Sequence, residues 1–230
     1  CFILLKNMKK LLLSLLFSWL LLLCASQVNA QPGNTQPTEK TRRFLLKYMA
    51  NIDSAQGDSK EGILKGIEMV ANASNNDWIS QYHAAFYNAV IGVNKKDTAS
   101  ANKMLDKAAS FIKRADSLQK DESEIVLLQA MINGMRIRVN PALGEKLGFA
   151  VMNDYEKAKK LNAENPRVWL VLGESFTYMP EEAGGGKKKA KEYLTTAIAK
   201  YANDKHDDPA WPSWGLDRAK QLLADLEKSK

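Results

Sequence analysis

The chain has 230 residues, of which 45% are hydrophobic and 26% charged, as is typical of a folded protein with one large domain or two small ones. Its 13 glycines and 7 prolines are too few for a fibrous protein, and two cysteines cannot form a disulfide scaffold. Removing residues 1–30 would lower the net charge from +7 to +4, because Lys6, Lys9 and Lys10 lie there and no acid does. Such a mild charge gives no argument for nucleic acid, and we expect no nucleic-acid partner.

The first thirty residues have the pattern of a secretory signal peptide. Met8 is the expected start, so residues 1–7 are interpreted as an upstream extension. Two lysines follow it, then an apolar run over 11–23 and a small-residue exit that ends at Ala30. As a helix the apolar run would span about 20 Å, less than the roughly 30 Å of a bilayer core. We expect cleavage after Ala30, a periplasmic or secreted protein, and no membrane span after cleavage.

Lipidation at Cys24 is the competing interpretation of this segment. The bacterial lipoprotein pattern requires a small residue before the cysteine, and Leu23 stands there instead. Cleavage after Ala30 would also leave residues 31–230 without a thiol. That excludes thiol catalysis, cysteine-ligated zinc and iron–sulfur clusters, and it suits an oxidising compartment.

Residues 31–37 are predicted to be a disordered leader, and residues 38–230 a single helical repeat domain. Apolar residues in the domain recur at spacings of three and four, the period of an amphipathic helix, and no strand-like alternation of useful length occurs. The pattern predicts about nine helices joined by short turns, with two longer irregular links at 140–148 and 179–187.

Polar residues between the apolar stripes predict where helices begin. Asp121 and Glu124 have the spacing of a capping box, in which each side chain satisfies a free backbone N–H. Asn165 precedes Pro166, which predicts an asparagine cap with proline at the first helical position. The pair at 208–209 is an aspartate followed by proline and predicts a further start of the same kind.

A small residue, a large one four positions later and an alanine three further on recur four times, with starts 42, 43 and 39 residues apart. A fixed period of this length predicts stacked helical hairpins. Valine replaces the small residue in the third of the four sets, which are Gly66/Val70/Ala73, Ala108/Ile112/Ala115, Val151/Tyr155/Ala158 and Ala190/Leu194/Ala197.

Trp169, Leu172, Gly173 and Phe176 form the pattern W-x2-L-G-x2-F, which resembles the tetratricopeptide repeat (TPR) family. Over nearly all of residues 38–230 the chain is similar to this family, and as a whole it resembles small exported repeat proteins of Bacteroidota. The resemblance implies an all-α, right-handed solenoid of about four TPR-like hairpins with a C-terminal capping helix. The tryptophan-rich segment 211–215 is expected to seal the last hairpin, or else to offer a ring to a partner.

The resemblance to the exported proteins implies no reaction, and we expect a non-enzymatic scaffold or binding module that engages a protein or peptide through its concave face. Its first helices would line that face, and tyrosine, methionine and arginine are enriched at binding surfaces. The candidate partner-binding residues are His83, Tyr87, Met131, Arg167, Leu170 and Glu174.

No catalytic residue, metal ligand or cofactor is predicted. Gly184–Gly186 followed by three lysines lacks the spacing of a nucleotide-binding loop, although such a turn before a helix could hold an anion on free backbone N–H groups. The alternative function is an enzyme, or an enzyme's accessory subunit, with the links 140–148 and 179–187 as site loops. Convergence of these links on one deep pocket with titratable groups would favour the enzyme, and a smooth open groove would favour binding.

Overall fold

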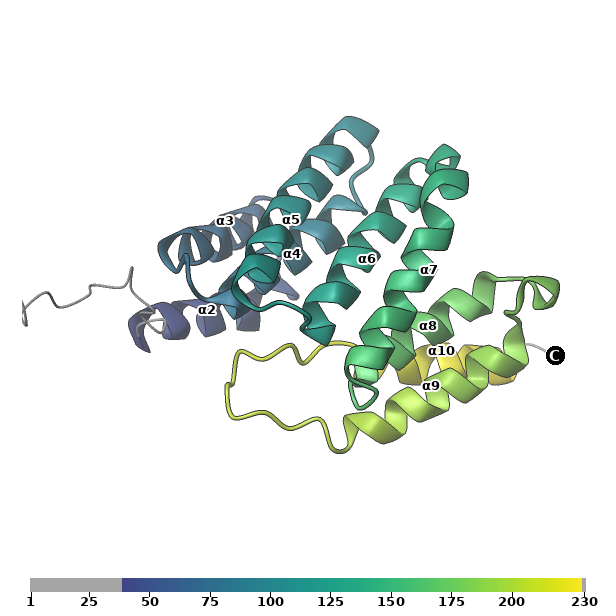
Figure 1. Cartoon of the computed structure of the whole chain (residues 1–230). Coiled ribbons are helices and arrows are strands. Elements are labelled where there is room, and N and C mark those ends of the chain that lie inside the picture. The colour runs from purple at the N-terminus through teal and green to yellow at the C-terminus, as the bar shows by residue number, and fades with distance from the viewer. Residues whose placement is uncertain (1–38, 229–230) are drawn as a thin grey trace, which may run out of the picture. The chain divides into compact units, whose positions relative to one another are not determined.

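The computed structural model describes residues 39–228, so the predicted signal peptide and leader lie outside the described residues. Within them the chain forms nine α-helices, two short 3-10 turns and no strand, which confirms the all-α prediction (Figure 1). The helices are α2 (Glu39–Ile52), α3 (Gly57–Ala73), α4 (Trp78–Gly92), α5 (Thr98–Leu118), α6 (Ser123–Val139), α7 (Gly144–Leu161), α8 (Pro166–Tyr178), α9 (Lys187–Tyr201) and α10 (Leu216–Lys228), with the turns η1 (Pro141–Leu143) and η2 (Glu181–Ala183).

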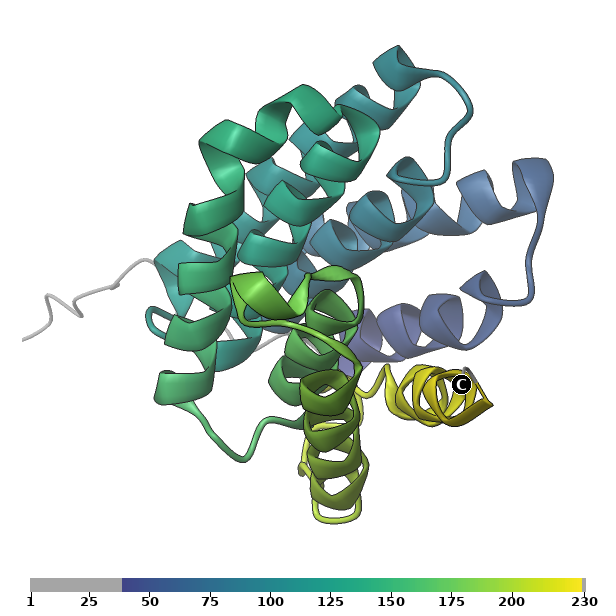
Figure 2. The same cartoon turned by 90° about the vertical axis from the view of Figure 1, so that its right-hand side faces the viewer.

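Consecutive helices pack in pairs and make four hairpins: α2 with α3, α4 with α5, α6 with α7, and α8 with α9 (Figures 1 and 2). The terminal helix α10 packs on α9 and covers it with Ala219, Leu222 and Leu226, as expected of a capping helix. The four small-large-small sets lie on the second helices of the hairpins. Every residue of the four sets is buried except Ala73. The small residues in these sets let neighbouring helices approach closely.

Helix α6 separates two hydrophobic cores. Its residues Ile125, Leu128 and Ile132 pack into the first core, with α2 to α5. Val126, Leu127 and Ala130, on the other side of the helix, pack into the second core, with α7 to α10. A helix that is apolar on both sides must be buried on both sides, so α6 joins the two halves of the stack.

The tryptophan motif acts at the contact between α8 and α9. A Cβ atom on Gly173 would lie 2.9 Å from Leu194 Cγ, so glycine permits this close approach. Trp169 is half-buried rather than fully enclosed, with its ring 5.1 Å from that of Tyr193 and its Nε1 donating to the Ala163 carbonyl at 2.8 Å. Phe176 completes the contact from a buried position, edge-on to Tyr193.

The predicted helix starts have mixed outcomes. Asn165 caps α8 through a bond from Arg167 N to its Oδ1, with Pro166 at the first position, which confirms that prediction. The predicted capping box at Asp121 is wrong, because Glu122 caps α6 and Glu124 is buried in an ion pair. No helix begins at 208–209, where Asp208 closes a turn by accepting from Ala210 N.

Residues 202–215 connect α9 to α10 without a helix, and we call them the return segment (Figure 1, yellow-green). Trp211 of this segment packs edge-on against Trp78, and Trp214 stacks on Phe86, both at 5.1–5.2 Å between ring centres. The tryptophans therefore cover α4 in the second hairpin. The prediction that they seal the last hairpin is wrong for Trp211, because an extended connection carries it back along the stack.

Candidate functional site

The return segment contacts the first helices of several hairpins. Arg42 of α2 pairs with Asp208 at 2.9 Å, and the Ala210 carbonyl accepts from His83 Nε2 of α4 at 2.7 Å. Asp204 pairs with Arg167 of α8 at 2.7 Å. The segment thus lies along the face on which the sequence placed the partner-binding residues.

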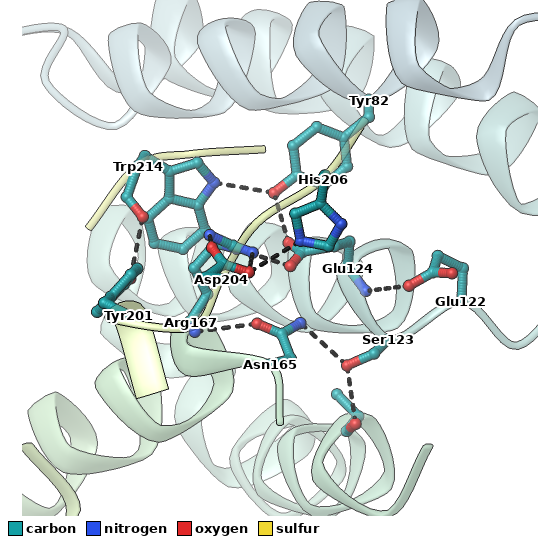
Figure 3. A network of polar contacts seen from close by, with 11 residues as sticks. Tyr82, Glu122, Ser123, Glu124, Asn165, Arg167, Tyr201, Asp204, His206 and Trp214 are labelled. Carbon is teal, nitrogen blue, oxygen red and sulfur yellow. Dashed lines mark hydrogen bonds and ion pairs between the residues drawn. The ribbon is translucent and has the colours of Figure 1, made fainter. Parts of the chain in front are cut away.

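A buried polar network anchors the return segment to α4, α6 and α8 (Figure 3). Arg167 is its centre: Nε donates to Glu124 at 2.6 Å, and the two terminal nitrogens donate to Asp204. Tyr82 donates to Glu124 at 3.2 Å and accepts from Trp214 Nε1 at 2.9 Å. Each buried charge therefore has a partner of opposite sign, as burial requires.

Burial and ion pairing act in opposite directions on the pKa values of this network. Burial raises the pKa of Glu124, although Arg167 favours the ionised carboxylate. Burial also acts to raise the pKa of Asp204, but hydrogen bonds from Arg167 and His206 lower it below its ordinary value. Burial raises the pKa of Tyr82 well above its ordinary value, so its phenol keeps a proton to donate.

A cavity of about 1130 Å³ lies between the α6/α7 and α8/α9 hairpins, and we call it the inter-hairpin cavity. Cavities that hold small molecules or cofactors are typically about 300–1000 Å³, so this one has room for a large organic ligand. Its wall contains four methionines, whose flexible thioethers adapt to a bound shape. These are Met131, Met135, Met152 and Met179.

Two aromatic side chains of the cavity wall are unusually exposed. Phe149 of α7 is 80% exposed and Tyr178 of α8 is 75% exposed, whereas Phe176 and Tyr155 of the same wall are buried. Exposed large apolar side chains beside a cavity mark a surface that a ligand can cover.

Five charged side chains border the cavity, and three of them form ion pairs. Glu174 pairs with Arg218 of α10, and Glu156 pairs with Lys159, which lies outside the wall. The two other cations of the wall are Arg138 and Lys189. Among residues 39–228 the cavity wall holds no histidine or cysteine.

Both irregular links reach this cavity, through Gly148 on one side and Met179, Ala183 and Gly184 on the other. The first link is largely helical, because η1 and the start of α7 occupy it. In the second, the N–H groups of all three glycines donate to chain carbonyls, which leaves none of them for an anion. The links thus converge on one pocket with titratable side chains in its wall, which is the outcome expected of the enzyme alternative. The hydroxyl of Ser175 in the same wall, however, donates to Val171 O of its own helix.

The structure separates the six residues that the sequence placed on the concave face. His83, Tyr87, Arg167 and Leu170 are at most 8% exposed and pack inside the protein. Met131 and Glu174 are half-buried and line the inter-hairpin cavity. Sequence reasoning missed Phe149, Tyr178 and Arg138, since an aromatic or cation on a helix gives no local sign that a second hairpin lies opposite.

Neither a membrane-spanning helix nor a metal-type cluster occurs in the described range. No α-helix between residues 39 and 228 combines the length and apolarity needed to cross a bilayer. The same residues contain no group of three or more His, Cys, Asp or Glu placed to hold a metal ion. His206, which is followed in the sequence by Asp207 and Asp208, bonds to Asp204 at 2.9 Å and stacks on Trp211.

Comparison with known proteins gives a likeness in fold to a solved structure. No family model matches the sequence, so none supports the TPR family specifically, and no curated protein matches it. A solved structure, the HusA haemophore from Porphyromonas gingivalis, matches with a TM-score of 0.71 and 26% sequence identity, over 86% of this chain and 98% of that one. The chain therefore has an all-helical fold similar to that of this haemophore.

Proposed function

We propose that this protein binds haem, or a planar tetrapyrrole like it, in the inter-hairpin cavity, and carries the ligand without transforming it. The observation that carries the proposal is the cavity itself, which is large, rich in methionine and bordered by the exposed rings of Phe149 and Tyr178. A flat apolar macrocycle would cover those rings and remove their surface from water.

The likeness to a haemophore supports the same ligand class. The donor set of the cavity wall also fits haem, because methionine thioethers and tyrosine phenols are both known axial ligands of haem iron. Haem supplies a large apolar surface, and the residues of α6, α7 and α8 supply a matching wall.

Binding is favoured over catalysis by the state of the polar groups in the wall. Two of its carboxylates are held by cations, and the Ser175 hydroxyl donates to its own helix. General acid–base or nucleophilic catalysis requires such groups to face one reacting atom with a base in reach. The convergence of the two links fits the enzyme alternative, but the carboxylates and the serine hydroxyl that line the cavity are already bound, and none is free for such catalysis.

A protein or peptide partner at the concave face stays a prediction. The return segment contacts that face, and His83 and Arg167 are held by it. Such a partner would have to bind the return segment itself or displace it, whereas the inter-hairpin cavity needs no displacement.

Export to the periplasm or beyond is part of the proposal. It is supported by the signal-peptide pattern of residues 1–30 and by the likeness to a haemophore. The N-terminal residue of the protein purified from its native cells tests this part, with Gln31 expected and a lipid-modified Cys24 contradicting it.

Titration of haem into residues 31–230, followed by the Soret absorbance and by quenching of tryptophan fluorescence, tests the ligand. We expect saturable one-to-one binding. Phe149→Ser and Tyr178→Ser should each weaken it about fivefold, since one ring–ring contact is worth roughly 0.5–1.5 kcal/mol.

Met69→Ser is the matched control, because Met69 of α3 is 71% exposed, similarly apolar and outside the cavity wall. It should leave haem affinity unchanged. Absence of saturable binding, or equal weakening by all three substitutions, would contradict the proposed function.

A further inference from the structure

Two cations of the inter-hairpin cavity have no carboxylate partner among residues 39–228. Arg138 lies in the last turn of α6, is exposed, and forms no ion pair with any residue of the described range. Lys189 lies in the first turn of α9, where Nζ donates to the Gly184 carbonyl at 2.8 Å and sits 4.0 Å from the centre of the Phe176 ring. The wall therefore has a surplus of positive charge.

The surroundings of Lys189 hold its ammonium group at the cavity. The Gly184 carbonyl accepts a hydrogen bond from it, and the ring of Phe176, which is also part of the wall, attracts it through a cation–π contact. Of the three hydrogens on the ammonium group, one is used by Gly184, which leaves donors for an anionic group. Arg138 presents a planar guanidinium, whose paired N–H groups match a carboxylate.

We propose that the ligand of this cavity carries carboxylates, and that Arg138 and Lys189 are the residues that select for them. The inference rests on the proposed function and narrows its substrate class to tetrapyrroles with free acid side chains, such as the two propionates of haem. The methionines and aromatic rings bind the macrocycle, and the two cations distinguish the acid from a neutral form of the same ring.

The exposure of these cations to water decides the size of the effect, since Arg138 is exposed and Lys189 half-buried. Neither is deeply desolvated, so each forms a pair in contact with water, and such pairs contribute little to affinity individually. About a fivefold gain per cation is expected, and it should fall as salt is raised. Affinity for the ring itself should depend weakly on salt because it derives from apolar surface.

Haem and haem dimethyl ester, in which both carboxylates are esterified, form the test pair of ligands. Wild-type protein should prefer haem to the ester by about ten- to thirtyfold at low salt. Arg138→Gln and Lys189→Gln should each reduce that preference about fivefold, and the double variant should bind both ligands alike. Lys188→Gln and Arg43→Gln are matched controls, exposed and outside the cavity wall, and should keep the full preference.

The outcomes separate this inference from the proposed function. Equal affinity of the wild-type protein for haem and its ester would overturn the carboxylate selection and leave haem binding intact. A preference that survives in the double variant, with binding unchanged, would overturn the assignment to Arg138 and Lys189. Failure of both ligands to bind would overturn the proposed function itself.

Discussion

A single buried imidazole shows how one residue ties the return segment to the stack. Nε2 of His83 must carry the hydrogen, because the Ala210 carbonyl that it contacts at 2.7 Å can only accept. Its Nδ1 is buried without a partner in the described residues, so protonation there would place an unpaired charge inside the protein. Burial accordingly lowers the pKa of His83 to about 4, against the raising effect of the Ala210 bond.

This shift predicts a loss of stability in mild acid. Below its unfolded pKa of 6.5 the unfolded chain takes up a proton on His83, while the folded protein does not until about pH 4. The free energy of unfolding is therefore highest above pH 6.5, and it falls by about 3 kcal/mol in total as the pH drops toward 4. Urea unfolding of wild type and His83→Gln from pH 7 to 4 measures it, and parallel profiles would refute it. Arg42, Asp77 and Asp208 remain in both proteins as the neighbouring charges.

At the scale of the element, helix pairing depends on small residues at crossing points. Gly173 permits α8 to approach α9, where an added Cβ would meet both the side chain and the backbone nitrogen of Leu194. A glycine inside an otherwise apolar helix costs helix propensity, so its presence at position 173 indicates a packing reason.

Gly173→Ala should destabilise the fold by about 1–3 kcal/mol, the usual cost of overpacking a core. Gly62→Ala is the matched control, since Gly62 lies within α3, is exposed, and has no atom within 4 Å of the added Cβ. That change should stabilise α3 by up to about 1 kcal/mol. Thermal unfolding of both variants checks the contrast, and a neutral or stabilising Gly173→Ala would show that the contact relaxes freely.

Helix starts show where local chemistry is decisive and where it is not. The cap at Asn165 was predictable, because an asparagine followed by proline has few other good conformations. The capping box at Asp121 failed because Glu124 is required elsewhere, in a buried pair with Arg167. A tertiary ion pair outweighs one backbone hydrogen bond in deciding where a side chain points.

At the scale of the whole domain, the Arg167 network connects parts of the chain that the repeat alone would leave apart. Arg167 of α8 contacts Glu124 of α6 and Asp204 of the return segment, and Glu124 accepts from Tyr82 of α4 (Figure 3). The network thus crosses from the first hydrophobic core to the second, next to α6.

Arg167→Met should cost about 3–5 kcal/mol, because it leaves Glu124 buried without its cation. Release of Asp204 should also speed trypsin cleavage after Lys205, which is exposed in the return segment. Lys95→Met is the control: its pair with Glu61 is exposed to water, so its loss should cost far less stability than the loss of Arg167. Similar costs for the two variants, with unchanged cleavage, would contradict the anchoring role.

The sequence by itself determined the helices, their pairing into hairpins and the capping role of α10, because each depends on the spacing of apolar and small residues within about forty positions. Only the tertiary structure decided the path of the return segment, whose contacts join residues 127 and 132 positions apart. It also decided the inter-hairpin cavity, whose wall forms where α6 and α7 meet the next hairpin. No local pattern encodes such contacts, because the partner of each side chain is set by the folded stack and not by its neighbours in sequence.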